Sequence, residues 1–179
     1  MRNKQSLNDY EKIIVLGGGV QQTRCIERCQ ELGYLVYCFD ADRNCRGAVK
    51  ADHFFEISID NLDAITHLLS ELKNVVAVMA PASEIGNQTA SKIAEKLRLP
   101  YNDPKVVEAT RNKSIMRNKI SFLGLKNPSY FIISPSDCPN NVLADKALKD
   151  LLPCIVKPVD SSAGRGVSIC HSKCDVKTS

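Results

Sequence analysis

The sequence predicts an α/β protein, in which a parallel β-sheet covered by helices is followed by a smaller unit of mixed α+β structure. Three observations support this prediction. Short apolar runs alternate with segments of helical periodicity up to about residue 101, a pattern that is typical of parallel sheets. The first apolar run ends in three glycines, and the next ends in an aspartate. After about residue 112 this alternation gives way to short helices and to two strands around a loop of small residues.

The composition excludes several classes of function before any motif is considered. Among the 179 residues, 44% are hydrophobic and 25% are charged, as in an ordinary globular protein. The net charge of +4 is spread along the chain and there is no Trp to stack on unpaired bases, so we expect anionic small molecules and no nucleic acid as partners. No apolar stretch approaches the roughly 20 residues of a membrane span, and residues 1–11 lack the apolar core of a secretion signal. We therefore expect a cytoplasmic protein without a membrane partner, whose eight cysteines are free thiols.

The elements of the first part follow in order. Residues 12–16 form a continuous apolar run, typical of a strand buried on both faces, and three glycines follow it. A helix that stops at Gly33 and a second strand that ends at Asp40 come next. Further strands are predicted within residues 51–59, 75–80 and 99–101, and helices at 61–73 and after Ser83, which would cap a helix beginning with Glu84. This order predicts a Rossmann-like sheet.

The glycine loop after the first strand leaves three interpretations open. The dinucleotide-binding pattern GxGxxG, laid over residues 17–22, places Gln22 where the last glycine belongs. Asp40 lies about 20 residues farther on, where a ribose-binding acid would lie. The loop then binds NAD(P), or the glycines only permit a tight turn, or the helix N-terminus binds another anion such as a carboxylate or a phosphate. A ligand would lie beyond the carboxyl ends of the strands, near residues 17–19, Asp40 and residues 81–84.

The second part is shorter and its core looks incomplete. Helices are predicted at residues 105–110, 113–123 and 141–152, a strand at 129–133, and no closing element after residue 170. A strand that delivers Lys157 leads into a loop of small residues carrying Arg165, and a second strand follows. Small residues let a backbone approach an anion, and the two cations favour a polyphosphate. A β-hairpin with solvated charges is the alternative.

The order of these motifs resembles the ATP-grasp superfamily of carboxylate–amine ligases, including its biotin-carboxylase-like and carbamoyl-phosphate-synthase-like members. The similarity extends over nearly the whole chain, from residue 12 to residue 170. After a Rossmann-like domain it rests on Asn112-Lys113 at a helix start, the Gly124-x-x-x-Pro128 segment, the strand carrying Lys157, and the loop at residues 161–167.

The resemblance implies binding of ATP together with Mg²⁺. Lys113 and Lys157 would bind the phosphates; a solvated helix charge and an edge-strand lysine are the alternatives. A loop that closes over the phosphates would consist of Ser161, Ser162, Ala163, Gly164, Arg165 and Gly166. The second substrate would lie against Gly18, Gly19 and Glu84, although Glu84 also fits an acid that only stabilises the first turn of its helix.

The resemblance further implies a pre-ATP-grasp Rossmann-like domain at residues 1–111 and the N-terminal part of an ATP-grasp domain at residues 112–179. The parent protein would phosphorylate a small carboxylate or bicarbonate with Mg-ATP and couple the acyl phosphate to an amine. The Mg²⁺ ligands are expected in a C-terminal part outside this chain, so we assign no catalytic residue and no metal ligand, and we expect no turnover by this fragment alone. An NAD(P)-binding module and a non-catalytic domain that forms a homodimer are the alternatives.

Overall fold

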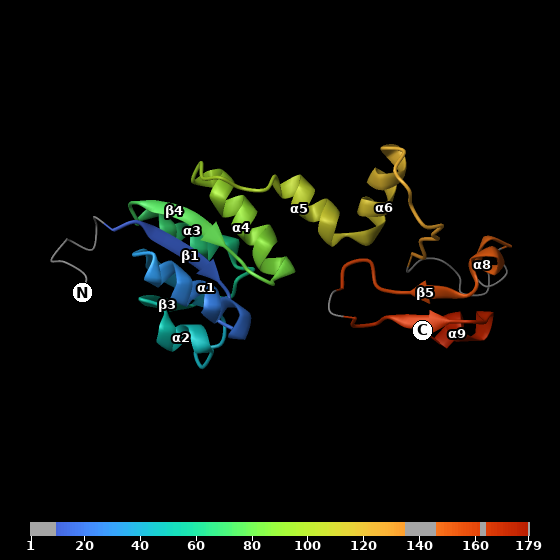
Figure 1. The fold of residues 1–179 in the computed structure, drawn as a ribbon, viewed down its shortest axis with the longest axis horizontal. Coiled ribbons are helices and arrows are strands. Elements are labelled where there is room, and N and C mark those ends of the chain that lie inside the picture. The colour runs from blue at the N-terminus through green and yellow to red at the C-terminus, as the bar shows by residue number, and fades with distance from the viewer. Residues whose placement is uncertain (1–9, 135–145, 162–163, 179) are drawn as a thin grey trace. The chain divides into compact units, whose positions relative to one another are not determined.

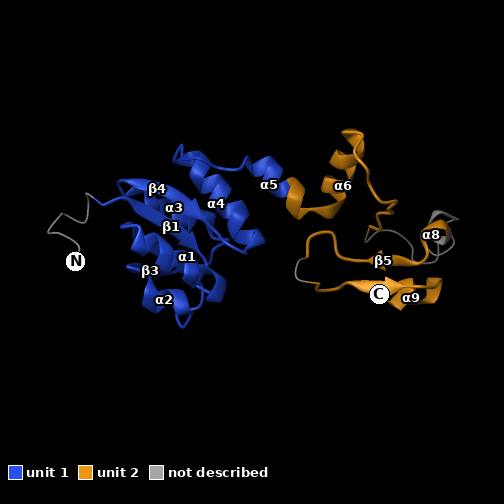
Figure 2. Cartoon of the chain, in the orientation of Figure 1, with its two compact units in different colours: residues 1–108 blue, residues 109–179 orange. Residues whose placement is uncertain are grey.

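The computed structural model describes residues 10–134, 146–161 and 164–178 (Figure 1). It divides the chain into two compact units, residues 1–108 and residues 109–179 (Figure 2). The first unit holds a four-stranded sheet and the second a two-stranded sheet. Within the described ranges, no helix is long and apolar enough to cross a membrane.

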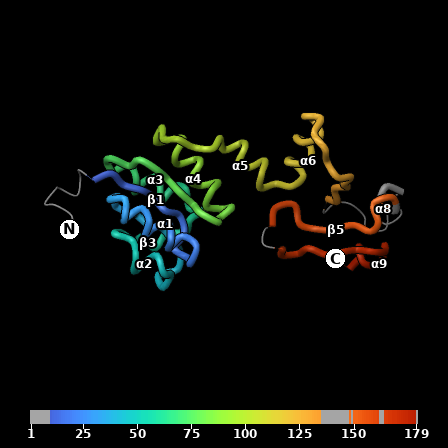
Figure 3. Tube along the Cα trace, in the orientation of Figure 1, coloured from blue at the N-terminus to red at the C-terminus, as the bar shows by residue number. Residues whose placement is uncertain are grey.

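The first unit is built on a parallel sheet whose strands lie in the order β3-β2-β1-β4. The strands are β1 (Lys12–Leu16), β2 (Leu35–Asp40), β3 (His53–Glu56) and β4 (Val75–Met79). The chain passes from β1 to β2 on one side and later returns to β4 on the other side of β1. The trace in Figure 3 shows β4 beside β1. The strand order therefore reverses between β1 and β4, which is where ligands of open α/β sheets bind. The prediction of a Rossmann-like parallel sheet is confirmed.

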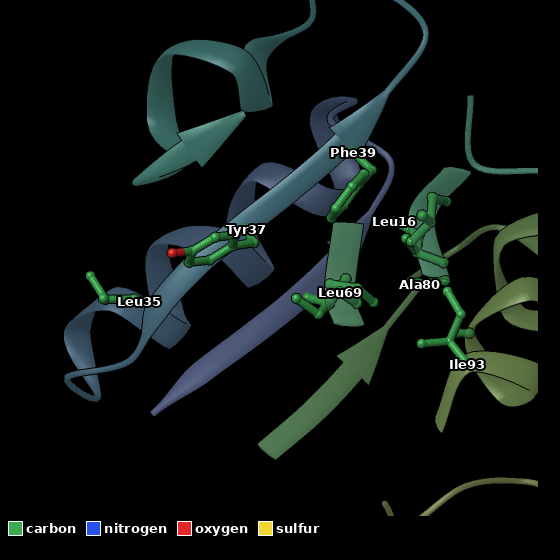
Figure 4. Close-up of a cluster of buried hydrophobic side chains, with 10 residues drawn as sticks. Leu16, Leu35, Tyr37, Phe39, Leu69, Ala80 and Ile93 are labelled. Atoms are coloured by element: carbon green, nitrogen blue, oxygen red, sulfur yellow. The ribbon is translucent and has the colours of Figure 1, made fainter. Parts of the chain in front are cut away.

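Helices cover both faces of this sheet, and the alternating side chains of β1 point to one face and then the other. The helices are α1 (Val20–Glu31), α2 (Arg46–Lys50), α3 (Leu62–Ser70) and α4 (Glu84–Lys96). Leu16 packs in a cluster with Leu69 of α3 and Ile93 of α4 (Figure 4). Val15 points to the opposite face and packs with Ile26 of α1. Each fully buried aliphatic side chain of this kind stabilises the fold by about 1.5–3 kcal/mol.

The second unit buries less of its apolar surface. α5 (Pro104–Arg111) begins in the first unit and ends in the second, and α6 (Lys113–Phe122), α8 (Lys146–Leu151) and α9 (Lys173–Thr178) follow. Strands β5 (Cys154–Val156) and β6 (Ser168–Cys170) pair antiparallel. Among the described residues of this unit, the buried hydrophobic side chains are Ala109, Leu148 and Cys170. Phe122, at the end of α6, is 91% exposed.

Two predicted strands are wrong. Residues 99–101 and 129–133 are irregular and pair with no strand in the described part of the chain. The second segment, Ser129–Ile133, is rich in β-forming residues, but such residues form a strand only where a neighbouring strand accepts their backbone hydrogen bonds.

Three helices differ from the sequence prediction. The expectation that no element follows residue 170 is wrong, because α9 closes the described chain. α2 was not predicted, since five residues are too few to show a helical period. Of the helix predicted at 141–152, α8 accounts for its final turns, whereas residues 141–145 lie outside the described residues.

Candidate functional site

The glycine loop between β1 and α1 is held by contacts within the first unit. The backbone N–H of Gly18 donates to Oδ2 of Asp40 at 2.7 Å, and the carbonyl of Gly18 accepts from the N–H of Gly47 at 2.7 Å. A Cβ at Gly18 would lie 2.3 Å from Sγ of Cys45, so that the Cys45 side chain would have to move, whereas a Cβ at Gly47 would lie 2.6 Å from the backbone Cα of Gly18. The absence of a side chain at Gly47 therefore permits the close approach of this loop to α2.

Asp40 serves the same loop from the end of β2. Its Oδ2 accepts the Gly18 N–H, and its Oδ1 accepts the N–H of Asp42 at 2.9 Å. Both carboxylate oxygens therefore have backbone donors. This arrangement weighs against a role for Asp40 in binding a ribose hydroxyl and favours bracing of the turn.

A buried thiol also contacts the glycine loop. Cys38, in the interior of β2, donates from Sγ to the carbonyl of Gly17 at 3.5 Å. Burial, with smaller contributions from the neighbouring Cys45 and Asp40, raises the pKa of the Cys38 thiol to about 12. At neutral pH the thiol is thus protonated and acts as a packing group and weak donor.

Gln22 occupies the space that a third fingerprint glycine would leave open. Its side chain is buried, and its Nε2 donates to the carbonyl of Pro81, which follows β4. Cβ atoms at Gly17 and Gly19 would lie 3.3 Å and 3.0 Å from Gln22 side-chain atoms. Gln22 thereby joins the carboxyl ends of β1 and β4, where the strand order reverses. In the sequence, Gln22 is recognisable only as a departure from the GxGxxG pattern. Its hydrogen-bond partner, the carbonyl of Pro81, could not be predicted from the neighbouring residues.

The predicted substrate residues follow the carboxyl ends of β1 and β4. Gly19 is half-buried before α1, and its carbonyl accepts from the backbone N–H of Thr23 at 3.0 Å. Glu84 is exposed in the first turn of α4, after Ser83, whose Oγ accepts from the N–H of Gly86 at 3.0 Å. The predicted capping role of Ser83 is confirmed. The roles of Gly18, Gly19 and Glu84 toward a substrate stay predictions.

In the second unit, Lys113 lies at the start of α6 against the loop that follows β5. Asn112 caps this helix, because its Oδ1 accepts from the N–H groups of Ser114 and Ile115 at 3.0 Å and 3.1 Å. The N–H of Lys113 donates to the carbonyl of Val159 at 2.8 Å, and its Nζ donates to the carbonyl of Ser161 at 2.5 Å. The structure thus brings together two of the segments predicted to bind phosphate.

The two ends of the loop lie close together, with Gly166 beside Pro158. Lys157 is exposed directly after β5, and Gly164, Arg165 and Gly166 are exposed before β6. Gly166 has a φ of +67°, which favours glycine, and a Cβ there would lie 2.8 Å from Cγ of Pro158. Both the backbone conformation and the lack of space therefore favour glycine at this position. The other two predicted loop residues, Ser162 and Ala163, lie outside the described residues.

The chain is similar to known enzymes over most of its length. No protein-family model matches the chain. The formate-dependent phosphoribosylglycinamide formyltransferase of Maridesulfovibrio salexigens is 30% identical over 173 residues, which are 92% of this chain and 41% of that protein. The enzyme of the same name from Methanocaldococcus jannaschii is 28% identical over 93% of this chain and 42% of its own length.

Solved structures show the same fold. An ADP complex of N5-carboxyaminoimidazole ribonucleotide synthetase matches 94% of this chain with a TM-score of 0.74 and 24% identity. The synthetase from Thermotoga maritima matches the same share with a TM-score of 0.71 and 18% identity. This chain covers 43% of each of those chains.

The chain matches the N-terminal portion of ATP-grasp superfamily ligases. It spans about two fifths of the length of the curated relatives. The resemblance seen in the motif order is thereby confirmed at the level of the superfamily.

Proposed function

We propose that this chain contributes ATP phosphate binding and part of the substrate cleft to an ATP-dependent carboxylate–amine ligase. The observation that carries the proposal is the contact between Lys113 and the Ser161 carbonyl. It joins two segments that the ATP-grasp pattern assigns to the same phosphates. The related synthetase that was solved as an ADP complex supports a nucleotide as the ligand.

The phosphate side of the proposal rests on charge and donors in the second unit. Lys113 and Lys157 supply cations, and the loop supplies backbone N–H groups, while Asp160 is the carboxylate within the loop. An ammonium group has three donors, so Lys113 can keep the Ser161 carbonyl and still bind a phosphate oxygen. A loop held at Pro158 and Gly166 can close over the phosphates without losing its two ends.

The substrate side lies in the first unit. Gly19 and Glu84 follow β1 and β4, the strands between which the sheet order reverses. A related protein was solved with ADP and 5-aminoimidazole ribonucleotide, and other relatives are formate-dependent enzymes. These names support a small carboxylate and an amine as the pair that the whole ligase would join through an acyl phosphate.

We assign no Mg²⁺ ligand among the described residues. They contain no group of three His, Cys, Asp or Glu side chains that could hold a metal ion by themselves, and at nucleotide sites Mg²⁺ is held by one or two carboxylates together with the phosphates. We therefore assign no metal-dependent step to this chain. Its own residues bind and orient phosphate, and the phosphoryl transfer is assigned to the whole ligase.

Inorganic tripolyphosphate tests the phosphate site, because it needs only the cations and backbone donors proposed here. Titration followed by NMR should shift the amide signals of Lys113, Lys157 and residues 164–166. Lys113→Ala and Lys157→Ala should each weaken binding by about 10–100-fold, since a hydrogen bond to a charged group contributes about 1.5–3 kcal/mol.

Lys126→Ala is the matched control, because Lys126 is an exposed lysine of the same unit outside the loop. Its binding curve should overlay that of the unaltered chain. Equal affinity in the Lys113 and Lys157 variants would contradict the proposal. Saturable NADH binding that tripolyphosphate does not displace would instead support the dinucleotide alternative.

A further inference from the structure

Two cysteines face each other across the hairpin that carries the candidate phosphate loop. In the antiparallel ladder of β5 and β6, Cys154 lies directly opposite Cys170. Residues in this relation have Cα atoms about 4.5–5.5 Å apart. Disulfides join Cα atoms about 4.4–6.8 Å apart, so the separation expected for this register lies within the range that a bridge needs.

The two thiols lie near each other and differ in access. Burial and, to a smaller extent, the neighbouring Cys170 raise the pKa of the Cys154 thiol, and neither cysteine is joined in a disulfide. Cys170 is fully buried, whereas Cys154 is half-buried. An oxidant would therefore reach Cys154 first, and Cys170 would lie behind it as the second thiol.

We propose that Cys154 and Cys170 are a redox-active pair that forms a reversible disulfide across the β5–β6 hairpin. A low-molecular-weight disulfide of the glutathione class is the oxidant. The thiolate of Cys154 attacks one of its sulfurs, forms a mixed disulfide, and releases one small thiolate. Cys170 then loses its proton to solvent and its sulfur attacks the sulfur of Cys154, releasing the second small thiolate. Two cysteine thiols are oxidised by two electrons, and one disulfide is reduced to two thiols.

The other close cysteine pairs in the described chain have less suitable geometry. Cys25 and Cys29 interact on α1, but residues four apart on a helix have Cβ atoms about 5–6 Å apart. Disulfides need a Cβ separation of about 3.5–4.5 Å, so a bridge would distort the helix. Cys38 lies inside the central sheet, and its thiol donates to the Gly17 carbonyl. The cross-strand pair needs no comparable change of backbone.

The bridge would have a consequence for the loop between the two strands. It would tie the strand that ends before Lys157 to the strand that follows Gly166 and Val167, closing residues 155–169 into a ring. If the loop binds phosphate as proposed above, oxidation would fix the distance between the two strands that carry it. The disulfide itself does not depend on that function, and it can be tested without a nucleotide.

The test is incubation of the chain with mixtures of oxidised and reduced glutathione, followed by alkylation and peptide mapping without reductant. The expected product is an intramolecular peptide cross-link between Cys154 and Cys170, lighter by two hydrogens and lost on reduction. Cys154→Ser should abolish it. Cys174→Ser is the matched control, because Cys174 is an exposed cysteine of the same unit, and it should leave the cross-link unchanged.

Peptide mapping of the unaltered chain tests the Cys154–Cys170 disulfide even if a variant fails to fold. Alkylation of both Cys154 and Cys170 under conditions that oxidise other cysteines would overturn the proposal. A cross-link at Cys25–Cys29 or between two chains through Cys174, with this pair still reduced, would overturn it equally. Loss of tripolyphosphate binding alone would count only against the proposed function, since the cross-link is measured separately.

Discussion

The side chain of Gln22 lies against the glycine loop. It is close to Gly17 and Gly19 and donates a hydrogen bond to the carbonyl of Pro81, at the position where the dinucleotide-binding pattern has a glycine for close packing of helix against strand. The sequence placed Gln22 and Asp40 correctly on the loop and at the end of a strand. It could not give their partners, because the Gln22 contact spans 59 residues of chain.

Replacing Gln22 tests this role at the scale of one residue. Gln22→Ala removes a hydrogen bond and the packing over the loop, and it should lower the free energy of unfolding by about 1–3 kcal/mol. Urea denaturation measures the loss as a lower midpoint at an unchanged slope. The exposed neighbour offers a control, since Gln21→Ala should stay within about 0.5 kcal/mol of the unaltered chain. Equal effects of the two variants would show that the side chain of Gln22 does not brace the loop.

At the scale of elements, the sequence predicted the strands with clear apolar runs and the helices that are long enough to show a helical period. The four central strands and the helices α1, α3, α4 and α6 lie where apolar runs and helical spacing indicate. It failed where an element depends on its surroundings. Residues 129–133 have the composition of a strand but pair with no strand among the residues that the structure describes, and α2 and α9 are too short for a period to be visible. Such short elements are stabilised by caps and packing rather than by propensity.

The start of α9 illustrates stabilisation by a cap and predicts a pH dependence. Oδ2 of Asp175 accepts the N–H groups of Ser172 and His171 at 2.8 Å and 2.9 Å, and its own N–H donates to Oγ of Ser172 at 3.3 Å. These hydrogen bonds hold the pKa of Asp175 below its ordinary value of 3.8. Because the folded pKa is the lower one, the carboxylate stabilises α9 fully above about pH 4, and this contribution is lost as the pH falls through the folded pKa.

NMR titration between about pH 6 and pH 2 should therefore show the amide signals of His171 and Ser172 moving together at a midpoint below 3.8. Asp175→Asn should remove that titration while leaving the signals of the first unit unchanged. A midpoint at or above 3.8 would contradict the capping role.

At the scale of the whole molecule, the two units differ in how much apolar surface they bury. The first unit has clusters of buried side chains on both faces of its sheet. The described part of the second unit buries few, and it leaves Ile155 and Ile169 61% and 69% exposed on the same pair of strands. Local stability follows the density of buried apolar contacts, so the two units should not open together.

Hydrogen exchange measured by mass spectrometry tests this difference directly. Amides of β1 and β2 should exchange more than about tenfold more slowly than those of β5 and β6, because the former open only when the central core unfolds. Tripolyphosphate should slow exchange in the second unit at β5, β6 and the start of α6, while the first unit stays unchanged and serves as the internal control. Equal protection of the two sheets in the free chain would mean that the hairpin is stabilised by more than its described contacts. The unequal stability argued here would then be wrong.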